Sequence, residues 1–176
     1  MITWFEPHIS NFGISRCPGS WTSSTKEDLN IFEQQQVEYV VCLQQEHELE
    51  RLEPPETISI RRQSLEQLGM SMLHEPIEDF CAPSMDQTLR ILAHINQQLQ
   101  RQHKVVVHCQ AGLGRAGTIA ACLLIEKGMS TDGAISMVRW LRPGAIQSQS
   151  QEQLIADFEQ SLVRAFERYP NQIEIN

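Results

Sequence analysis

The sequence has no long hydrophobic run and no evident targeting segment. Its longest uninterrupted apolar stretch is IAACLLI, residues 119–125, whereas a helix needs about 20 apolar residues to cross a bilayer. The N-terminal MITWFEPHIS lacks a basic region followed by an apolar stretch, so no secretory signal peptide is apparent. We therefore expect no membrane insertion and a cytoplasmic location.

Disulfide frameworks and metal-ligand patterns are missing as well. The five cysteines are odd in number and scattered singly, unlike the paired cysteines of small secreted proteins. The six histidines show no convincing ligand spacing, so we predict no metal and no other cofactor. A reducing compartment is the simplest home for such a chain, and it would keep a reactive thiol reduced.

The charge and length of the chain set further limits. A net charge of −8 repels polyanions, so we expect neither a nucleic acid nor an anionic membrane as partner. A length of 176 residues suits one hydrophobic core, and we predict a single domain over residues 1–176. The sequence leaves the oligomeric state open, with a monomer as the simplest expectation.

What the sequence does contain is a short segment rich in chemistry, VVVHCQAGLGRAGT at 105–118. It reads as a buried strand, a glycine-bearing loop and the start of a helix. Successive backbone N–H groups in such a loop form an anion-binding nest, and the helix N-terminus adds its positive dipole. Gly112 and Gly114 permit the backbone conformations that a cradle of this kind requires.

Two side chains in this segment match the chemistry of a phosphoryl group. Arg115 can fork two hydrogen bonds onto phosphate, and the same positive field favours a nucleophilic thiolate at Cys109. We therefore predict that phosphate is bound by Gln110, Ala111, Gly112, Leu113, Gly114 and Arg115. The alternative is a buried core cysteine with a surface arginine nearby, which the strand–glycine–helix context disfavours.

Hydrophobic periodicity predicts an α/β fold around a mostly parallel sheet, because strands alternate with helices. The cysteine loop would lie at the carboxyl end of its strand, where such sheets bind ligands. Strands are expected at residues 12–17, 37–43, 57–60, 70–74 and 105–107. Helices are expected at residues 25–36, 46–52, 61–68, 85–102, 131–141 and 150–168, with a further helix from 115.

The segment HCQAGLGRAGT matches the HCxxGxxR pattern of the cysteine-dependent protein tyrosine and dual-specificity phosphatases. The resemblance extends from about Ile31 to Phe158. It is greatest to the compact dual-specificity branch, to which the cyclin-dependent-kinase-associated phosphatase belongs. PIEDFCAPS at 76–84 and GAIQSQSQ at 144–151 carry the comparison outside the loop.

The resemblance implies roles for residues outside the loop. Asp79 would be the general acid, with Glu78 beside it as a rival and a solvated loop carboxylate as the plain alternative. Gln147 and Gln151 would orient the water that hydrolyses a phosphocysteine, although in a glutamine-rich chain they could simply be solvated. His108 would hydrogen-bond the loop backbone and help to hold the thiolate, without acting as a base.

One position departs from the family pattern, and one cysteine has a possible redox role. Relatives usually carry Ser or Thr after the arginine, whereas this chain has Ala116. Without that hydroxyl, Cys109 should be a poorer leaving group, so we predict slow hydrolysis of the enzyme intermediate. Cys42 ends a strand that we expect beside the loop strand, and relatives form a reversible disulfide from such a position. A buried structural role for Cys42 is the alternative.

These observations predict a cysteine-dependent protein phosphatase acting through a phosphocysteine intermediate. Its partner would be a phosphorylated protein, with phosphotyrosine and also phosphoserine or phosphothreonine as substrates. Two other functions stay open: a catalytically weak phosphoprotein-binding module and a rhodanese-type sulfurtransferase. The loop has no lysine between Cys109 and Arg115, which weighs against a highly phosphorylated inositol head group.

Overall fold

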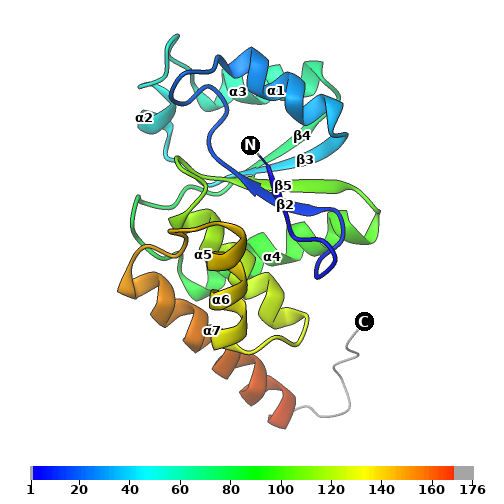
Figure 1. Ribbon diagram of the computed structural model, residues 1–176, viewed down its shortest axis with the longest axis vertical. Coiled ribbons are helices and arrows are strands. Elements are labelled where there is room, and N and C mark those ends of the chain that lie inside the picture. Colours follow the sequence, from blue (N-terminus) through cyan, green and yellow to red (C-terminus); the bar gives the residue numbers. More distant parts are fainter. Residues whose placement is uncertain (1, 169–176) are drawn as a thin grey trace.

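A five-stranded sheet lies at the centre of the computed structural model, which describes residues 2–168 (Figure 1). Its strand order is β1-β2-β5-β3-β4. The strands are β1 Thr3–Trp4, β2 Phe12–Ser15, β3 Val37–Cys42, β4 Ser71–His74 and β5 Lys104–His108. Only the β1–β2 pairing is antiparallel; β2, β5, β3 and β4 run parallel. The expected α/β fold with a mostly parallel sheet is thereby confirmed.

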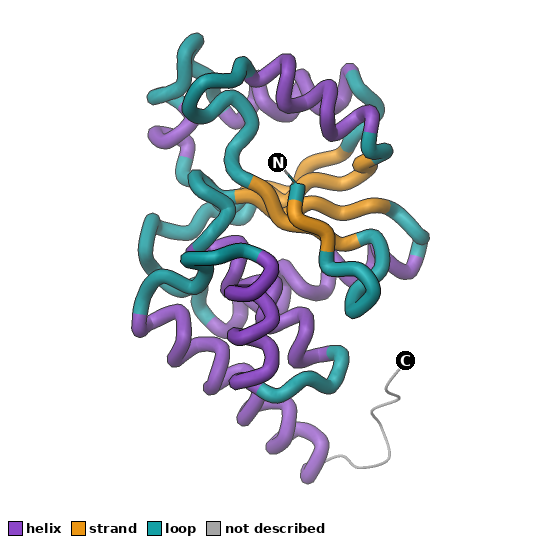
Figure 2. The backbone as a smooth tube through the Cα atoms, viewed as in Figure 1, coloured by secondary structure: helices purple, strands orange, loops and turns teal. Residues whose placement is uncertain are grey.

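Helices cover both faces of this sheet (Figure 2). On one side lie α1 (Thr25–Gln34) and α3 (Ile58–Gln67). On the other lie four helices: α4 Met85–Gln100, α5 Gly114–Glu126, α6 Thr131–Leu141 and α7 Gln149–Arg168. The short α2 (Glu46–Leu49) follows β3. Because both faces are covered, the central strand β5 can carry apolar side chains on both faces, and Val105, Val106 and Val107 are fully buried.

Alternation along the strands divides the interior into two main clusters. Val41 and Val107 point toward α4–α7, in the larger cluster, which also contains Cys109. Val40 and Val106 point toward α1 and α3, in the smaller cluster. Successive residues of a strand face opposite sides of the sheet. Neighbouring residues of the same strand therefore belong to different clusters.

Two elements differ from expectation at the N-terminal half. Residues 57–60, predicted as a strand, begin α3 instead: the Thr57 hydroxyl accepts a hydrogen bond from the Ile60 N–H and caps the helix. The β-branched residues suggested a strand, but the burial of Arg61 and Leu65 on one helix face prevails. The strand β1 was not predicted, because two residues carry no periodicity.

The other expected elements are present with shifted ends. The strand predicted to reach residue 17 ends at Ser15, where the chain leaves the sheet to pack against the cysteine loop. Serine residues cap three helices, as sequence chemistry favours; these caps are Ser24, Ser84 and Ser130. The parallel strands β2, β5, β3 and β4 all end at one edge of the sheet, so the segments that follow them converge there.

Candidate active site

The cysteine loop lies between the end of β5 and the start of α5. Cys109 follows His108 directly and is only 2% exposed. Gly112 has a φ of +68°, and a Cβ there would lie 2.3 Å from the Ser15 carbonyl oxygen. No other residue fits that position without moving the backbone. The turn between strand and helix thus depends on glycine, as the sequence suggested.

The loop carbonyls are held from outside the loop. The Cys17 N–H donates to the Gln110 oxygen at 3.0 Å. Arg142 donates from Nη2 to the Ala111 oxygen (2.9 Å) and from Nε to the Gly112 oxygen (3.1 Å). Its third nitrogen, Nη1, reaches Thr3 Oγ1 at 3.2 Å. In a trans peptide the N–H points opposite to the carbonyl, so the amides that follow these carbonyls face the interior of the loop.

Arg115 lies in the first turn of α5 and is 1% exposed. Nη1 donates to Glu48 Oε2 at 2.7 Å and to the Ile77 oxygen at 2.9 Å. Nη2 donates to Glu48 Oε1 at 2.8 Å and lies 2.9 Å from Asp79 Oδ1. Nε has no hydrogen-bond partner. A buried guanidinium N–H without a partner is costly, and the inward amides of the loop make this side of Arg115 suited to an anion.

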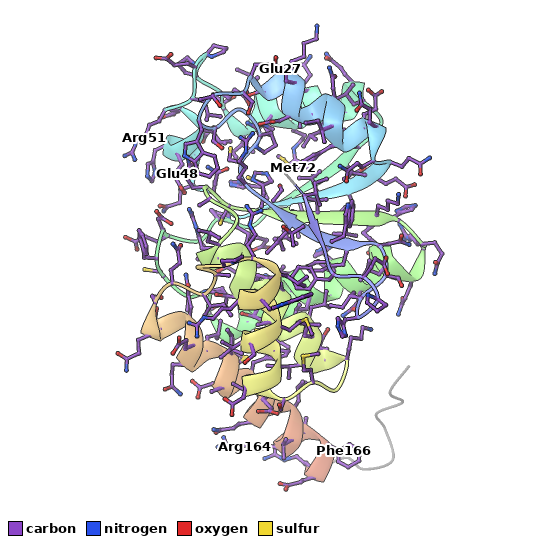
Figure 3. All side chains as sticks on the ribbon, in the orientation of Figure 1. Glu27, Glu48, Arg51, Met72, Arg164 and Phe166 are labelled. Atoms are coloured by element: carbon purple, nitrogen blue, oxygen red, sulfur yellow. The ribbon has the colours of Figure 1, made fainter. Side chains whose placement is uncertain are left out.

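Sequence reasoning missed Glu48, the residue that orients Arg115. It lies on α2, at the left edge of the view in Figure 3. Burial alone would raise its pKa, but hydrogen bonds from Arg115 and from the Gln45 N–H hold the pKa below its ordinary value. Glu48 is therefore a carboxylate that fixes the guanidinium plane. The available signal was its position, six residues after Cys42, just beyond a strand end that borders β5.

The structure brings Asp79, and not Glu78, to Arg115. Asp79 is about half exposed, at 52% of its side chain, and its Oδ1 also accepts the Phe80 N–H at 3.1 Å. Glu78 is exposed and makes no ion pair within residues 2–168. The segment 76–84, which we name the acid loop, therefore reaches the phosphate cradle through Asp79.

Gln147 and Gln151 lie against Gly114, where the cysteine loop joins α5. A Cβ on Gly114 would be 2.9 Å from both Gln147 Oε1 and Gln151 Nε2. Gln151 accepts the Gln147 N–H at 2.8 Å and donates to the Cys81 oxygen at 3.2 Å. The two amides thus sit between the start of α5 and the acid loop, where a water approaching Cys109 could be held.

Two further loop neighbours are buried polar residues. Gln44 donates to Gln110 Oε1 at 2.7 Å and steadies the first loop side chain. Burial, together with the nearby charge of Arg61, lowers the pKa of His108 to about 3, so its ring is neutral. Neither ring nitrogen meets hydrogen-bond geometry, although the Cys109 backbone is near enough to oppose the shift slightly. The expected hydrogen bond from His108 to the loop stays a prediction, because the ring lies close to the Cys109 backbone.

Cys42 and Cys109 belong to different hydrophobic clusters, although Cys42 pairs in register with His108, the residue before Cys109, so a disulfide between them stays a prediction. Both thiols are free. Cys42 packs with Val40 and Val106 in the smaller cluster, on the face of the sheet opposite the cluster that contains Cys109. Burial raises the pKa of Cys42 to about 12, which leaves little thiolate for an exchange reaction. These observations favour the structural alternative for Cys42.

The remaining features concern Ala116, metals and membranes. Ala116 is fully buried in the first turn of α5, so this position offers no hydroxyl to Cys109.

Within residues 2–168, no group of three or more His, Cys, Asp or Glu side chains could hold a metal ion. Over the same residues, every helix is too short or too polar to cross a bilayer.

Comparisons with known proteins agree with this geometry. Residues 13–129 match the family model described as "Polymorphic toxin system, DSP-PTPase phosphatase". The chain is 34% identical over 113 residues to protein tyrosine phosphatase domain-containing protein 1 of Danio rerio, covering 64% of this chain and 16% of that protein. It is 34% identical over 100 residues to human cyclin-dependent kinase inhibitor 3, covering 55% and 47%. The chain thus spans less than half the length of these curated relatives.

Solved structures give the same result over nearly the whole chain. The crystal structure of Tk-PTP in its active form is 31% identical, with a TM-score of 0.76, and the match covers 90% of this chain and 96% of that one. A kinase-associated phosphatase with its catalytic-site cysteine changed to serine is 24% identical, with a TM-score of 0.80 and coverage of 93% and 96%; it supports the fold. On the strength of the matched family model, the chain belongs to the dual-specificity and tyrosine phosphatase family, as the cradle around Cys109 and Arg115 indicated.

Proposed function

We propose that this protein hydrolyses phosphomonoesters on proteins through a phosphocysteine formed on Cys109. The observation that carries the proposal is the free Nε of Arg115, buried at the mouth of a loop whose carbonyls are engaged on the outside. A phosphoryl group placed there would meet inward amides, the α5 dipole and a guanidinium edge. These groups stabilise the negative charge on the equatorial oxygens during transfer.

In the first step the Cys109 thiolate attacks phosphorus, an S–P bond forms and the P–O bond to the leaving group breaks. A phosphoryl oxygen that competes with Asp79 for Nη2 of Arg115 would gain a two-point grip through Nη2 and Nε. The displaced Asp79, in its acid form, would then donate a proton to the leaving oxygen. Its position on an exposed loop leaves room for this movement.

In the second step water attacks the phosphocysteine and the S–P bond breaks. Asp79, now a carboxylate, takes the proton from the water, while Gln147 and Gln151 orient it. Cys109 leaves as a thiolate and inorganic phosphate is released. Because Ala116 offers no hydroxyl to that thiolate, we expect this step to limit turnover. We further propose phosphotyrosine, phosphoserine and phosphothreonine as substrates, on a cytoplasmic phosphoprotein.

The decisive test is pre-steady-state hydrolysis of p-nitrophenyl phosphate. We expect a burst of p-nitrophenol close to one equivalent, followed by slow turnover, and no release at all from Cys109→Ser. Rapid acid quench should recover a phosphorylated peptide that contains Cys109. Binding of a phosphopeptide without any burst would instead support a phosphoprotein-binding module, the candidate that Ala116 keeps open.

A further inference from the structure

The segments around the cradle differ in charge according to the strand that precedes them. In the sheet, β2 lies on one side of β5, whereas β3 and β4 lie on the other. The segment after β3 runs through α2, and the segment after β4 is the acid loop with the start of α4. Each of these two segments contacts Arg115, through Glu48 and Asp79 respectively. They therefore border one side of the phosphate-binding site around Arg115, which we call the cleft.

This side is strongly acidic. Residues 46–56 contain five glutamates and one arginine, and residues 75–86 contain four acidic residues and neither lysine nor arginine. By contrast, residues 16–26, which follow β2, contain no aspartate or glutamate, and neither do residues 140–151, which contact the loop from α6 and α7. The charge of the cleft is thus carried by one side.

Five carboxylates of these segments are exposed and make no ion pair within the described residues: Glu46, Glu50, Glu53, Glu78 and Asp86. We call three of them, Glu50, Glu53 and Glu78, the acidic wall. Figure 3 shows Arg51, the one arginine of this side, near Glu48 at the same edge of the molecule. On the other side Arg16 cannot mirror the wall, because its guanidinium is already bonded to Asp28.

An independent observation indicates a ligand at Arg115, which both acidic segments contact through Glu48 and Asp79. Nε of Arg115 lacks a partner although the residue is 1% exposed, so a phosphoryl group fits between the two sides. Three exposed aromatic rings belong to these segments: Trp21, at 68%, after β2, Trp140, at 76%, near the end of α6, and Phe80, at 58%, next to Asp79. Exposed aromatic rings beside a phosphate cradle suit the side chains of a peptide.

We propose that the cleft selects phosphorylated protein segments that carry lysine or arginine next to the phosphoresidue, on the side that lies along the acidic wall. This inference rests on the proposed function. A phosphoester already brings negative charge to the cleft, and further anions would be repelled by Glu50, Glu53 and Glu78. A phosphorylated lipid in an anionic membrane would meet that repulsion over its whole surface. Basic residues beside the phosphoresidue would instead be attracted by the same carboxylates.

The test compares three phosphotyrosine peptides that differ only in flanking residues, which are Lys, Gln or Glu. At low salt we expect kcat/KM for the Lys peptide to exceed that for the Glu peptide about tenfold, since each exposed ion pair contributes modestly. The ratio should shrink at 0.5 M NaCl. Phosphatidylglycerophosphate in phosphatidylglycerol vesicles should be a poorer substrate than the Lys peptide.

Charge reversal tests whether the acidic wall causes the preference for the Lys peptide. In Glu50→Lys/Glu53→Lys/Glu78→Lys we expect the Lys-to-Glu peptide ratio to fall to about one or to invert. The matched control is Glu33→Lys/Glu66→Lys/Glu167→Lys, which changes net charge equally at exposed positions outside the two acidic segments. The control should keep the wild-type ratio. Thermal unfolding of both triple variants verifies that they are folded.

The outcomes separate this inference from the proposed function. Turnover of p-nitrophenyl phosphate with a peptide ratio near one, a ratio that the wall variant leaves unchanged, or faster hydrolysis of the lipid would each overturn the charge selection alone. Absence of any Cys109-dependent turnover would overturn both. The proposal stands if the ratio exceeds fivefold and collapses only in the wall variant.

Discussion

Two arginines are buried in the part of the chain that the structure describes, and they use their donors differently. Arg61, inside α3, donates from Nε to Glu56 at 2.7 Å and from Nη2 to the Pro18 oxygen at 2.8 Å, and both Nη atoms lie 4.0 Å from Cys17 Sγ. Arg115 directs both Nη atoms at protein acceptors and leaves Nε free. Both residues are paired with a buried glutamate, so burial and ion pairing alone do not distinguish them.

The difference lies in where the unused donor points. Arg61 ties the segment after β2 to α3 and uses Nε to do so, which makes it part of the scaffold. Arg115 is held in place by Glu48 through its Nη atoms, and we propose that its unpartnered Nε donates to a bound phosphoryl group. A buried arginine with a spare donor beside a nest of amides is a ligand site, whereas one with Nε and Nη2 engaged is a structural tie. The predictions below test this distinction.

The largest expected effect is on Arg115. In Arg115→Lys the charge remains but the two-point grip on phosphate is lost, so kcat/KM for p-nitrophenyl phosphate should fall about a thousandfold. Steady-state kinetics measure the loss, and circular dichroism confirms the fold. A loss below tenfold would mean that the free Nε is not the phosphate donor.

Arg61 should affect stability instead. Arg61→Met leaves Glu56 buried without its partner, and the free energy of unfolding should fall by about 3 kcal/mol. Urea denaturation measures this change. Arg61→Met/Glu56→Gln removes the uncompensated charge and should recover part of the loss. At a temperature where circular dichroism shows the variant to be folded, kcat should stay within about threefold of wild type. A large loss of kcat without unfolding would break the comparison.

The third prediction concerns how stability depends on pH through His108, which lies near the charge of Arg61. Its pKa is lowered to about 3 by burial and then by Arg61. Between pH 6.5 and about 3, only the unfolded state binds this proton, so stability is complete above pH 6.5 and is lost as pH falls, on the order of 1 kcal/mol per unit. Urea denaturation at pH 7, 6 and 5 should show a steeper loss for wild type than for His108→Asn. Equal slopes would contradict the assignment.

The smallest expected effect restores a donor within the cradle. In Ala116→Ser a hydroxyl can donate to the Cys109 thiolate, so steady-state kcat should rise about threefold to tenfold. The burst rate should change little, because the first step does not depend on thiolate departure. Stopped-flow measurements with p-nitrophenyl phosphate separate the two phases. An unchanged kcat would refute the role given to Ala116.

The local parts of the site could be read from the sequence, and the long-range parts could not. Cys109, Gly112 and Arg115 lie within one loop, so their spacing encodes their geometry. Glu48 reaches Arg115 across 67 positions, and in the sequence it looks like any charge on a short acidic helix. Asp79, Gln147 and Gln151 were predicted by resemblance to the family. The sequence around a loop carboxylate or amide does not show which distant residue it will contact.

The fold shows the same division. The apolar runs at β3 and β5 could be read from the sequence, because each depends only on neighbouring residues. Residues 57–60 were misassigned because β-branched composition suggests a strand, while the deciding influence is the burial of Arg61 and Leu65 against distant elements. The pairing of Cys42 with His108 likewise depends on strand register, which one sequence does not reveal.

The third nitrogen of Arg142 has a practical consequence for anyone who trims this protein. The same guanidinium that holds the Ala111 and Gly112 carbonyls also reaches Thr3 on β1, ten residues before the family match begins at residue 13. A domain boundary drawn at that match would delete β1, expose the edge of β2 and remove one support of Arg142. Such a truncated protein could retain Cys109 and Arg115 yet bind phosphate poorly, and its weak activity would be mistaken for a property of the enzyme.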